Sequence, residues 1–518
     1  MRVDGRSFWE LVERRAAATP DALFLLDDAG RSLSFGAYRA ASLRVAAGLR
    51  ELGVTAGTPV TWILPTRVSG ILLMTALARL GAVQNPIIPI YRQREVSFCT
   101  RQTGARFLIV PPAFRNFDYA AMAEEIAREQ AELRVLVAEH ALPEGDPARL
   151  EPAPAPPARP DDAPIRWIFY TSGTTADPKG ARHSDATLMP SALGMVRCFD
   201  LGPADRVALV FPVTHIGGPS WIMAGLIAGC AQLVVESFGP ASVDFLSENG
   251  VTQAGAGTAF HNVYLAAQRK RPGERLFPRV RAFPGGGAPK PPQLHFDIQK
   301  EMGGVGIVSG YGLTECPIIA MNTLADPDEK LAYTEGAVNP PGESRIRVVK
   351  PDGSEAAPGE EGELRVRGPQ LCKGYLDTSL NADAFDAQGF FRTGDLGTLD
   401  ADGFVTITGR LKDVIIRNGE NVSAKEIEDL LYQHPKVADV AVIGVPDART
   451  GERVCAVVAC RDPAEALRFD EMVAFLKGQK LMLQKIPERL ELVDAVPRNP
   501  SGKILKRELR ERYAAASG

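Results

Sequence analysis

Short runs of β-branched and apolar residues alternate with helical patterns through the first 410 residues, and this alternation constrains the fold most strongly. Strands that alternate with helices form βα units, whose parallel strands are buried on both faces of a sheet. The sequence therefore predicts an α/β fold with a large body of largely parallel sheets packed with helices. Clear examples of the expected strands are residues 59–64, 105–110, 166–170, 206–211 and 305–308.

A second, smaller α/β unit is expected after the segment Gly409-Arg-Leu-Lys-Asp413. It spans about 100 residues, the usual size of a small domain. We therefore predict a large N-terminal domain over residues 1–409 and a small C-terminal domain over residues 410–518. The elements expected in the second domain are a helix after Ser423, strands at 437–445 and 454–460, and a helix at 469–480.

Composition excludes several classes of protein. With 45% hydrophobic and 24% charged residues, the chain of 518 residues is neither disordered nor fibrous. A formal net charge of −4 gives no general attraction to nucleic acid. The seven cysteines lack C-x-x-C spacing, no signal peptide is evident, and the longest apolar stretches are too short for a bilayer. We expect a cytoplasmic protein without integral membrane association; the sequence leaves a homodimer and transient membrane contact open.

The segment Tyr170-Thr-Ser-Gly-Thr-Thr-Ala-Asp-Pro-Lys-Gly180 carries the most specific chemical signal. Gly173 lets consecutive N–H groups face an anion, the hydroxyls can donate to phosphate oxygens, and Lys179 adds a positive charge. Pro178 and Gly180 stand where a Walker-type loop has Gly and Ser or Thr, so that loop is excluded. A plain surface turn does not explain the full string. The segment predicts a site for the phosphates of a nucleotide.

This string resembles the phosphate loop of the adenylate-forming superfamily, which includes acyl-CoA synthetases, non-ribosomal peptide adenylation domains and firefly luciferase. Ala176 stands where the usual pattern has Gly. The resemblance covers essentially the whole chain, because five more motifs follow in the family's order. These are Gly285-Gly-Gly-Ala-Pro289, Tyr311-Gly-Leu-Thr-Glu315, Phe391-Arg-Thr-Gly-Asp-Leu396, Gly409-Arg-Leu-Lys-Asp413 and Pro497-Arg-Asn-Pro-Ser-Gly-Lys503. The dinucleotide-binding signature G-x-G-x-x-G is only partly matched, and the hydrolase signature G-x-S-x-G does not occur.

The resemblance implies a site for ATP built from these motifs. The expected nucleotide-binding residues are Thr171, Ser172, Gly173, Thr174, Thr175, Lys179, Gly285, Gly286, Gly287, Ala288, Tyr311, Gly312, Thr314, Asp395, Arg410 and Lys503. The expected catalytic residues are Thr174, Lys179, His215, Glu315 and Lys503. Glu315 would hold Mg²⁺, which prefers hard oxygen ligands. Lys503 would offset the repulsion between the substrate carboxylate and ATP.

Each of these residues has a plainer interpretation when it is taken alone. Lys503 fits an ordinary basic tail, and Glu315 fits a carboxylate at a helix N-terminus. Asp395 fits a turn or a helix cap. Arg410 fits a solvated surface charge, and His215 fits a core histidine.

The resemblance further implies two half-reactions. The substrate carboxylate attacks the α-phosphate of MgATP to give acyl-AMP and pyrophosphate, and a thiol then displaces AMP. Between these steps the C-terminal domain is expected to rotate about Lys412 and bring Asn418 and Gly419 to a tunnel for coenzyme A. Free coenzyme A is the expected acceptor, because no carrier-protein domain or Gly-Gly-x-Ser site follows Lys503. A stand-alone enzyme loading a separate carrier protein and a non-catalytic nucleotide sensor are the alternatives.

An apolar monocarboxylic acid is the expected substrate, since no basic residue is evident to pair with a second carboxylate. Small residues at Gly287 and Gly310 would leave room for a bulky ring. The segments 85–92 and 174–183 resemble those of ligases for alicyclic acids such as cyclohexanecarboxylate, and for related steroid side-chain and fatty acids. The residues expected to line the acyl pocket are His215, Gly217, Gly218, Thr258, Gly287 and Gly310.

Overall fold

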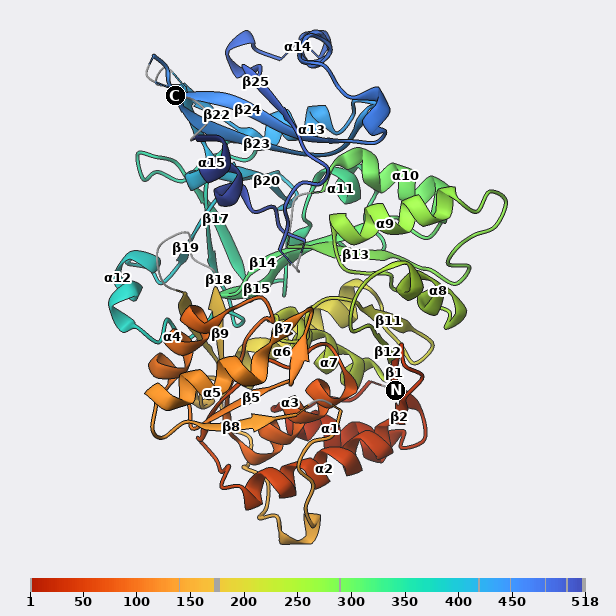
Figure 1. Cartoon of the computed structure of the whole chain (residues 1–518), viewed down its shortest axis with the longest axis vertical. Helices are drawn as coiled ribbons and strands as arrows, with labels where there is room; N and C mark the ends of the chain where they lie inside the picture. The colour runs from red at the N-terminus through yellow and green to blue at the C-terminus, as the bar shows by residue number, and fades with distance from the viewer. Residues whose placement is uncertain are drawn as a thin grey trace.

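The computed structural model describes residues 2–514 apart from 139, 172–177, 288–289, 418–419, 448, 480 and 500–501, and it leaves out the side chains of Glu420 and Asn421. The N-terminal sheets and helices fill the lower half of the molecule in Figure 1, and the C-terminal elements lie at its top. None of the helices in the described part of the chain combines the length and apolar character that crossing a bilayer takes.

Two mainly parallel sheets form the lower half. The first has the order β11 (Arg206–Leu209), β12 (Ala231–Val234), β1 (Leu23–Asp27), β2 (Ser32–Ser34). The second has the order β10 (Lys179–His183), β9 (Trp167–Thr171), β4 (Val83–Pro86), β3 (Pro59–Trp62), β5 (Phe107–Val110), β8 (Arg134–Val137). The end strands β2 and β10 run antiparallel to their neighbours, and the other pairings are parallel. The predicted α/β body is confirmed.

Helices cover these sheets and share one large apolar core with them. The apolar stretch at residues 71–78 lies in α3, where Ile71, Leu73 and Met74 are fully buried. The α-helices in the described N-terminal part are α1 (Phe8–Ala18), α2 (Phe35–Glu51), α3 (Val68–Leu80), α4 (Gln93–Thr103), α5 (Tyr119–Glu129), α6 (Asp185–Cys198), α7 (Gly217–Ala228), α8 (Pro240–Glu248), α9 (Thr258–Arg269), α10 (Pro292–Met302), α11 (Asp328–Tyr333) and the short α12 (Asn381–Ala384). The short strands β6 (Ala113–Phe114) and β7 (Phe117–Asp118) form a separate hairpin.

Two further sheets differ from the parallel pattern. In the third, β13 (Phe283–Gly286) and β14 (Ile307–Leu313) are parallel, and β15 (Cys316–Met321) and β16 (Ala337–Val338) continue antiparallel. The fourth, β17 (Arg345–Val349), β18 (Gly362–Arg367), β19 (Phe391–Leu399) and β20 (Val405–Arg410), is wholly antiparallel. Buried and less buried residues alternate along β18, which is typical of an antiparallel sheet with one covered face. The expectation of parallel sheets therefore holds only up to β14.

The C-terminal part has its own sheet and helices. Its elements are β21 (Ile415–Arg417), β22 (Glu420–Val422), α13 (Ala424–Leu431), β23 (Val437–Asp447), β24 (Gly451–Cys460), α14 (Phe469–Gly478), β25 (Arg489–Leu492) and α15 (Lys506–Ala514). Alternate residues of β23 enter two apolar clusters, Val440 and Val442 on one face and Ala441 and Ile443 on the other. As expected, Ser423 caps α13, its hydroxyl accepting the N–H of Glu426 at 3.4 Å. A boundary between residues 409 and 410 stays a prediction.

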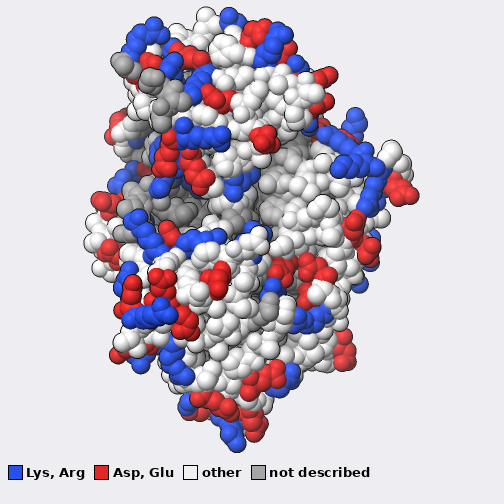
Figure 2. Space-filling view, in the orientation of Figure 1, with Lys and Arg blue, Asp and Glu red and all other residues white. Residues whose placement is uncertain are grey.

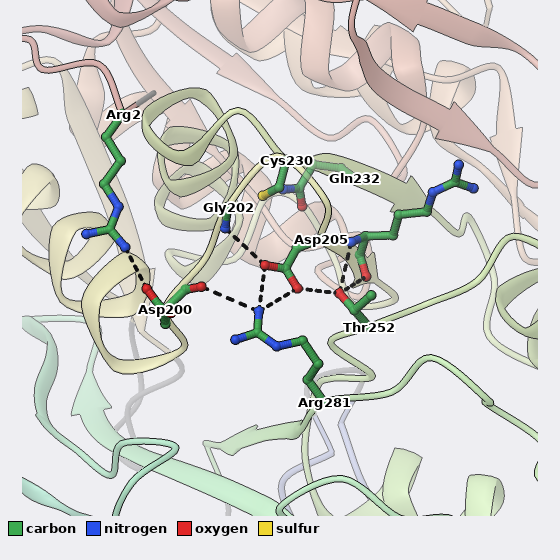
Figure 3. A network of polar contacts seen from close by, with 9 residues as sticks. Arg2, Asp200, Gly202, Asp205, Cys230, Gln232, Thr252 and Arg281 are labelled. Atoms are coloured by element: carbon green, nitrogen blue, oxygen red, sulfur yellow. Dashed lines mark hydrogen bonds and ion pairs between the residues drawn. The ribbon is translucent and has the colours of Figure 1, made fainter.

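A buried polar network joins the start of β11 to the segment that leads into β13 (Figure 3). Asp205 is only 3% exposed, and its carboxylate accepts hydrogen bonds from Arg281 Nη1 at 2.8 and 2.9 Å. The Thr252 hydroxyl donates to the same carboxylate at 2.7 Å, and the N–H of Gly202 donates at 3.0 Å. Because a buried carboxylate is costly unless it is paired, this network fixes the segment that leads into β13 relative to the start of β11.

Candidate active site

A cavity of about 570 Å³ lies where the C-terminal part meets β14, β19 and β20. The space-filling view shows the molecule hollowed between its upper and lower parts (Figure 2). Five of the sequence motifs contribute to the lining, although they are spread over more than 200 residues. The predicted site residues that line the cavity are Gly287, Gly310, Tyr311, Gly312, Asp395, Arg410, Lys412 and Lys503.

Asp395 is the buried acidic centre of this cavity. It lies directly opposite Arg410 in the register of β19 and β20, and Arg410 Nε is 2.7 Å from Asp395 Oδ1. The Tyr311 hydroxyl donates to Asp395 Oδ2 at 2.8 Å. Burial and the nearby Asp395 charge raise the pKa of Tyr311 well above its usual value, so the phenol remains a neutral donor. The three residues form a fixed group that can hydrogen-bond to sugar hydroxyls and pair with a phosphate charge.

Glycines allow β13 and β14 to approach closely at the cavity wall. Gly286 is opposite Gly310 in the parallel register, and a Cβ on Gly286 would lie 2.9 Å from the Gly310 carbonyl oxygen. A Cβ on Gly312 would lie 2.2 Å from the backbone nitrogen of Ile318. Strand β13 begins at Phe283 and includes Gly285 and Gly286, so these motif glycines lie within the sheet.

Glu315 lies next to this cavity and is held by Tyr375. The carboxylate is 7% exposed, and its Oε1 accepts the Tyr375 hydroxyl at 2.6 Å. Burial raises the pKa of Glu315, and the hydrogen bond from Tyr375 opposes that rise. The Lys179 ammonium lies 5.7 Å from the centre of the Tyr375 ring. Tyr375 thus contacts both the expected metal ligand and the expected phosphate lysine.

Sequence reasoning missed Tyr375. Its segment runs beside β10, where the N–H of Leu376 donates to the Gly180 carbonyl at 2.8 Å. This pairing brings residues nearly 200 positions apart to the end of the phosphate loop. No local pattern around a lone tyrosine indicates such a contact.

Lys503 reaches the cavity from the C-terminal part. The side chain remains exposed, but it faces enclosed space beside Arg410 and Lys412. Removal from bulk water, followed by the charges of Arg410 and Lys412, lowers the pKa of Lys503 to about 8. Lys412 lies in the short turn Leu411–Asp413, which connects β20 to the C-terminal part. The protonation of the Lys503 amine therefore depends on which charged groups are bound in the cavity.

The other predicted pocket residues lie at the starts of two helices. His215, Gly217 and Gly218 are at the start of α7, Thr258 begins α9, and none of the four lines the described cavity. Burial lowers the pKa of His215 to about 4, and its Nδ1 accepts the N–H of Gly217 at 3.2 Å. A Cβ on Gly218 would lie 2.0 Å from the Val213 carbonyl oxygen, so backbone packing already requires that glycine. An acyl-pocket role for these residues stays a prediction.

For several other predicted residues, the structure describes no contact with the cavity. Thr171 ends β9, and the Thr314 carbonyl lies 2.9 Å from His183 Nε2. The residues that lie outside the described ones are Ser172, Gly173, Thr174, Thr175, Ala288, Asn418 and Gly419.

Comparison with protein families gives two matches. The AMP-binding enzyme model matches residues 12–376, and the AMP-binding enzyme C-terminal domain matches residues 426–503. The chain is 29% identical to the medium-chain fatty-acid–CoA ligase of Escherichia coli strain K12, over 97% of this chain and 89% of that protein. It is 28% identical to a salicyl-AMP ligase / salicyl-S-ArCP synthetase of Mycobacterium tuberculosis strain H37Rv, over 99% and 92%.

Solved structures share the whole fold. ATP-bound MatB from Rhodopseudomonas palustris is 29% identical and has a TM-score of 0.85, with 98% of this chain and 100% of that chain covered. The apo form of the same protein gives a TM-score of 0.73 at the same coverage. The arrangement of this chain is thus closer to the ATP-bound form. Together with the matched regions, these likenesses confirm the resemblance seen in the motifs: the chain belongs to the AMP-binding enzyme family.

Proposed function

We propose that this protein is an ATP-dependent acyl-CoA synthetase that activates an apolar monocarboxylic acid as acyl-AMP and transfers the acyl group to free coenzyme A. The observation that carries the proposal is the meeting of Lys503 with Tyr311, Asp395 and Arg410 around one cavity. This constellation fits an AMP-forming acid–thiol ligase, and the chain is similar to a medium-chain fatty-acid–CoA ligase.

In the first half-reaction a carboxylate oxygen bonds to the α-phosphorus while the bond to the pyrophosphate oxygen breaks. Asp395 and Arg410 would orient the nucleoside, and Tyr311 would pack on the base. Lys503 would lie between the carboxylate and the α-phosphate, where two anions approach each other. Placing fixed charges where negative charge concentrates is the main source of catalysis in such transfers.

Glu315 fits a magnesium site by its donor chemistry. Mg²⁺ takes oxygen ligands and is usually bound by one or two carboxylates together with substrate phosphates. The Tyr375 hydroxyl occupies Glu315 Oε1, which leaves Oε2 for a cation. Glu315 would hold the ion, which would supply charge neutralisation on the phosphates, and Lys179 would hold those phosphates in place.

In the second half-reaction the thiol sulfur bonds to the acyl carbon, the bond to AMP breaks, and the thiol proton is released. Lys503 and the thiol cannot approach the same carbonyl together, so we propose that the C-terminal part turns about Lys412 between the two steps. Gly419 would then lie beside the pantetheine tunnel.

The acceptor has one competing assignment. The mycobacterial relative is named for transfer to ArCP, so a separate carrier protein is the alternative to free coenzyme A. Incubation with acid, MgATP and coenzyme A alone separates the two. Release of AMP with formation of the thioester supports the synthetase, and acyl-AMP that persists until a carrier protein is added supports the alternative.

Lys503→Ala tests the proposed division of labour. We expect this variant to lose acyl-AMP formation and to keep most of the thioester formation from supplied acyl-AMP. Gly419→Leu should show the reverse, because its side chain would obstruct the tunnel. Both half-reactions are measured separately, by ATP–pyrophosphate exchange and by acyl-CoA production. Equal loss of both steps in Lys503→Ala would refute the proposal.

A further inference from the structure

We propose that Arg498 is a positioning residue that holds Lys503 in the orientation needed for acyl-AMP formation, an inference that rests on the proposed role of Lys503. Arg498 does not have to touch the substrate in this role. It acts on the backbone of the loop that carries the lysine.

A tight hairpin presents Lys503 to the cavity. The N–H of Leu505 donates to the Pro497 carbonyl at 2.9 Å, and the N–H of Asn499 donates to the Lys503 carbonyl at 2.8 Å. The side chain of Asn499 also accepts the N–H of Lys503 at 2.9 Å. These bonds define the hairpin, but they do not attach it to the remainder of the C-terminal part.

Arg498 makes that attachment. Its Nη1 donates to the Gly502 carbonyl at 2.6 Å, immediately before Lys503. Its Nε and Nη2 donate to the two carboxylate oxygens of Asp439 on β23, at 3.0 and 2.8 Å. The Tyr432 hydroxyl at the end of α13 accepts a further bond from Nη2 at 3.2 Å. One guanidinium therefore connects the lysine loop to β23, the end strand of the C-terminal sheet, and to a helix end.

These contacts of Arg498 with Gly502, Asp439 and Tyr432, which we call the clamp, require the chemistry of arginine. The Arg498 side chain is 14% exposed and that of Asp439 is 21% exposed, so solvent screens the pair only weakly. A planar guanidinium can satisfy a carboxylate with two parallel bonds and still direct a third donor at a carbonyl, which an ammonium cannot do in a fixed geometry. The loop position is thus set by a rigid group.

The N-terminal part contacts the same loop on its other side. Gly502 has a φ of +85°, and a Cβ there would lie 3.6 Å from the Ala259 Cβ in α9. The loop therefore rests between Arg498 and the start of α9 in the arrangement that the structure records. Without Arg498, Lys503 would keep its charge but lose its fixed position. A misplacement of about 1 Å costs on the order of 100-fold in rate for a reaction that depends on positioning.

The test is Arg498→Gln in the full-length enzyme, with both half-reactions measured. We expect ATP–pyrophosphate exchange to fall about 100-fold, the cost of a misplacement of about 1 Å. Thioester formation from supplied acyl-AMP should stay within about threefold, because Lys503 is not used in that step. Asp439→Asn should give the same selective loss, since it frees the guanidinium. A matched control is Lys436→Gln, which breaks an ion pair with Glu471 at 2.9 Å in the same part of the chain.

The results separate a positioning role from a general structural one. Equal losses in the two half-reactions, in both Arg498→Gln and Asp439→Asn, would overturn the proposal, as would unchanged pyrophosphate exchange. Lys503→Ala is measured alongside. If that variant fails to show the selective loss, the proposed function of Lys503 is itself wrong; if it shows the loss and the Arg498 variant does not, only the clamp is wrong.

Discussion

Replacing Gly310 by alanine tests whether this wall of the cavity sets the size of the acid. A Cβ at Gly310 would lie 3.5 Å from the Ala320 carbonyl oxygen, 3.6 Å from Met321 Cγ and 3.8 Å from Ile318 Cγ2. These are ordinary contact distances, and the backbone at Gly310 lies in β14 without a positive φ. The protein itself can therefore accommodate the methyl group, and the cost falls on whatever occupies the cavity.

The expected magnitude follows from the size of the added group. One methylene in an apolar pocket is worth about 1–3 kcal/mol, or roughly 10- to 200-fold in kcat/KM. Gly310→Ala should reduce kcat/KM by that factor for a bulky alicyclic acid and leave short unbranched acids nearly unaffected. The assay is pyrophosphate release across acids of increasing width, with the KM for ATP measured as a check on the nucleotide site.

Gly478→Ala is the matched control, because nothing lies within 4 Å of a Cβ there and the position is outside the cavity lining. Unchanged selectivity in Gly310→Ala would remove Gly310 from the acyl pocket. An equal loss for all acids, accompanied by a higher KM for ATP, would assign the glycine to the nucleotide site instead.

Two further predictions concern charge in the site. Tyr375→Phe keeps the ring beside Lys179 but removes the hydrogen bond to Glu315, so the Mg²⁺ concentration for half-maximal activity should rise about 10- to 100-fold, measured in a magnesium titration of pyrophosphate exchange; an unchanged titration curve would contradict a metal role for Glu315. The pKa of Lys503 is lowered to about 8, so the lysine is charged below that pH and kcat/KM for adenylation should fall as the pH rises through about 8. Binding of anionic ATP favours the charged form, which moves the decline in kcat to higher pH, and thioester formation from acyl-AMP should show no such decline. If kcat/KM instead fell only near the ordinary pKa of a lysine, the lowered pKa of Lys503 in this cavity would be refuted.

The sequence predicts the elements of this fold where a local pattern determines them. The strands at 59–64, 105–110, 166–170 and 206–211 are present as β3, β5, β9 and β11 because continuous apolar runs bury well in parallel sheets. The helix after Ser423 begins where the cap places it. The antiparallel sheet of β17–β20 was not anticipated. Its strands lack the regular alternation with long helices, because the only α-helix in the described connection from β18 to β19 is the short α12.

The site residues likewise fall into those that the sequence could identify and those that it could not. Tyr311, Asp395, Arg410 and Lys503 were identifiable because each lies in a motif with a recognisable spacing, and the structure brings them to one cavity. Tyr375 and the Asp439 partner of Arg498 were not, because their importance arises from contacts between distant segments. Asp439 is 59 residues from Arg498 and carries no signal of its own. Long-range hydrogen bonds of this kind become visible only in the folded chain.

The most direct test of the proposed function is pyrophosphate release by the unaltered protein with a panel of carboxylic acids, MgATP and free coenzyme A. The account predicts that an apolar monocarboxylic acid, alicyclic or fatty, gives the highest kcat/KM, with AMP and the acyl thioester formed in equal amounts. Fastest release with a dicarboxylate or an amino acid, or release without any thioester, would contradict it.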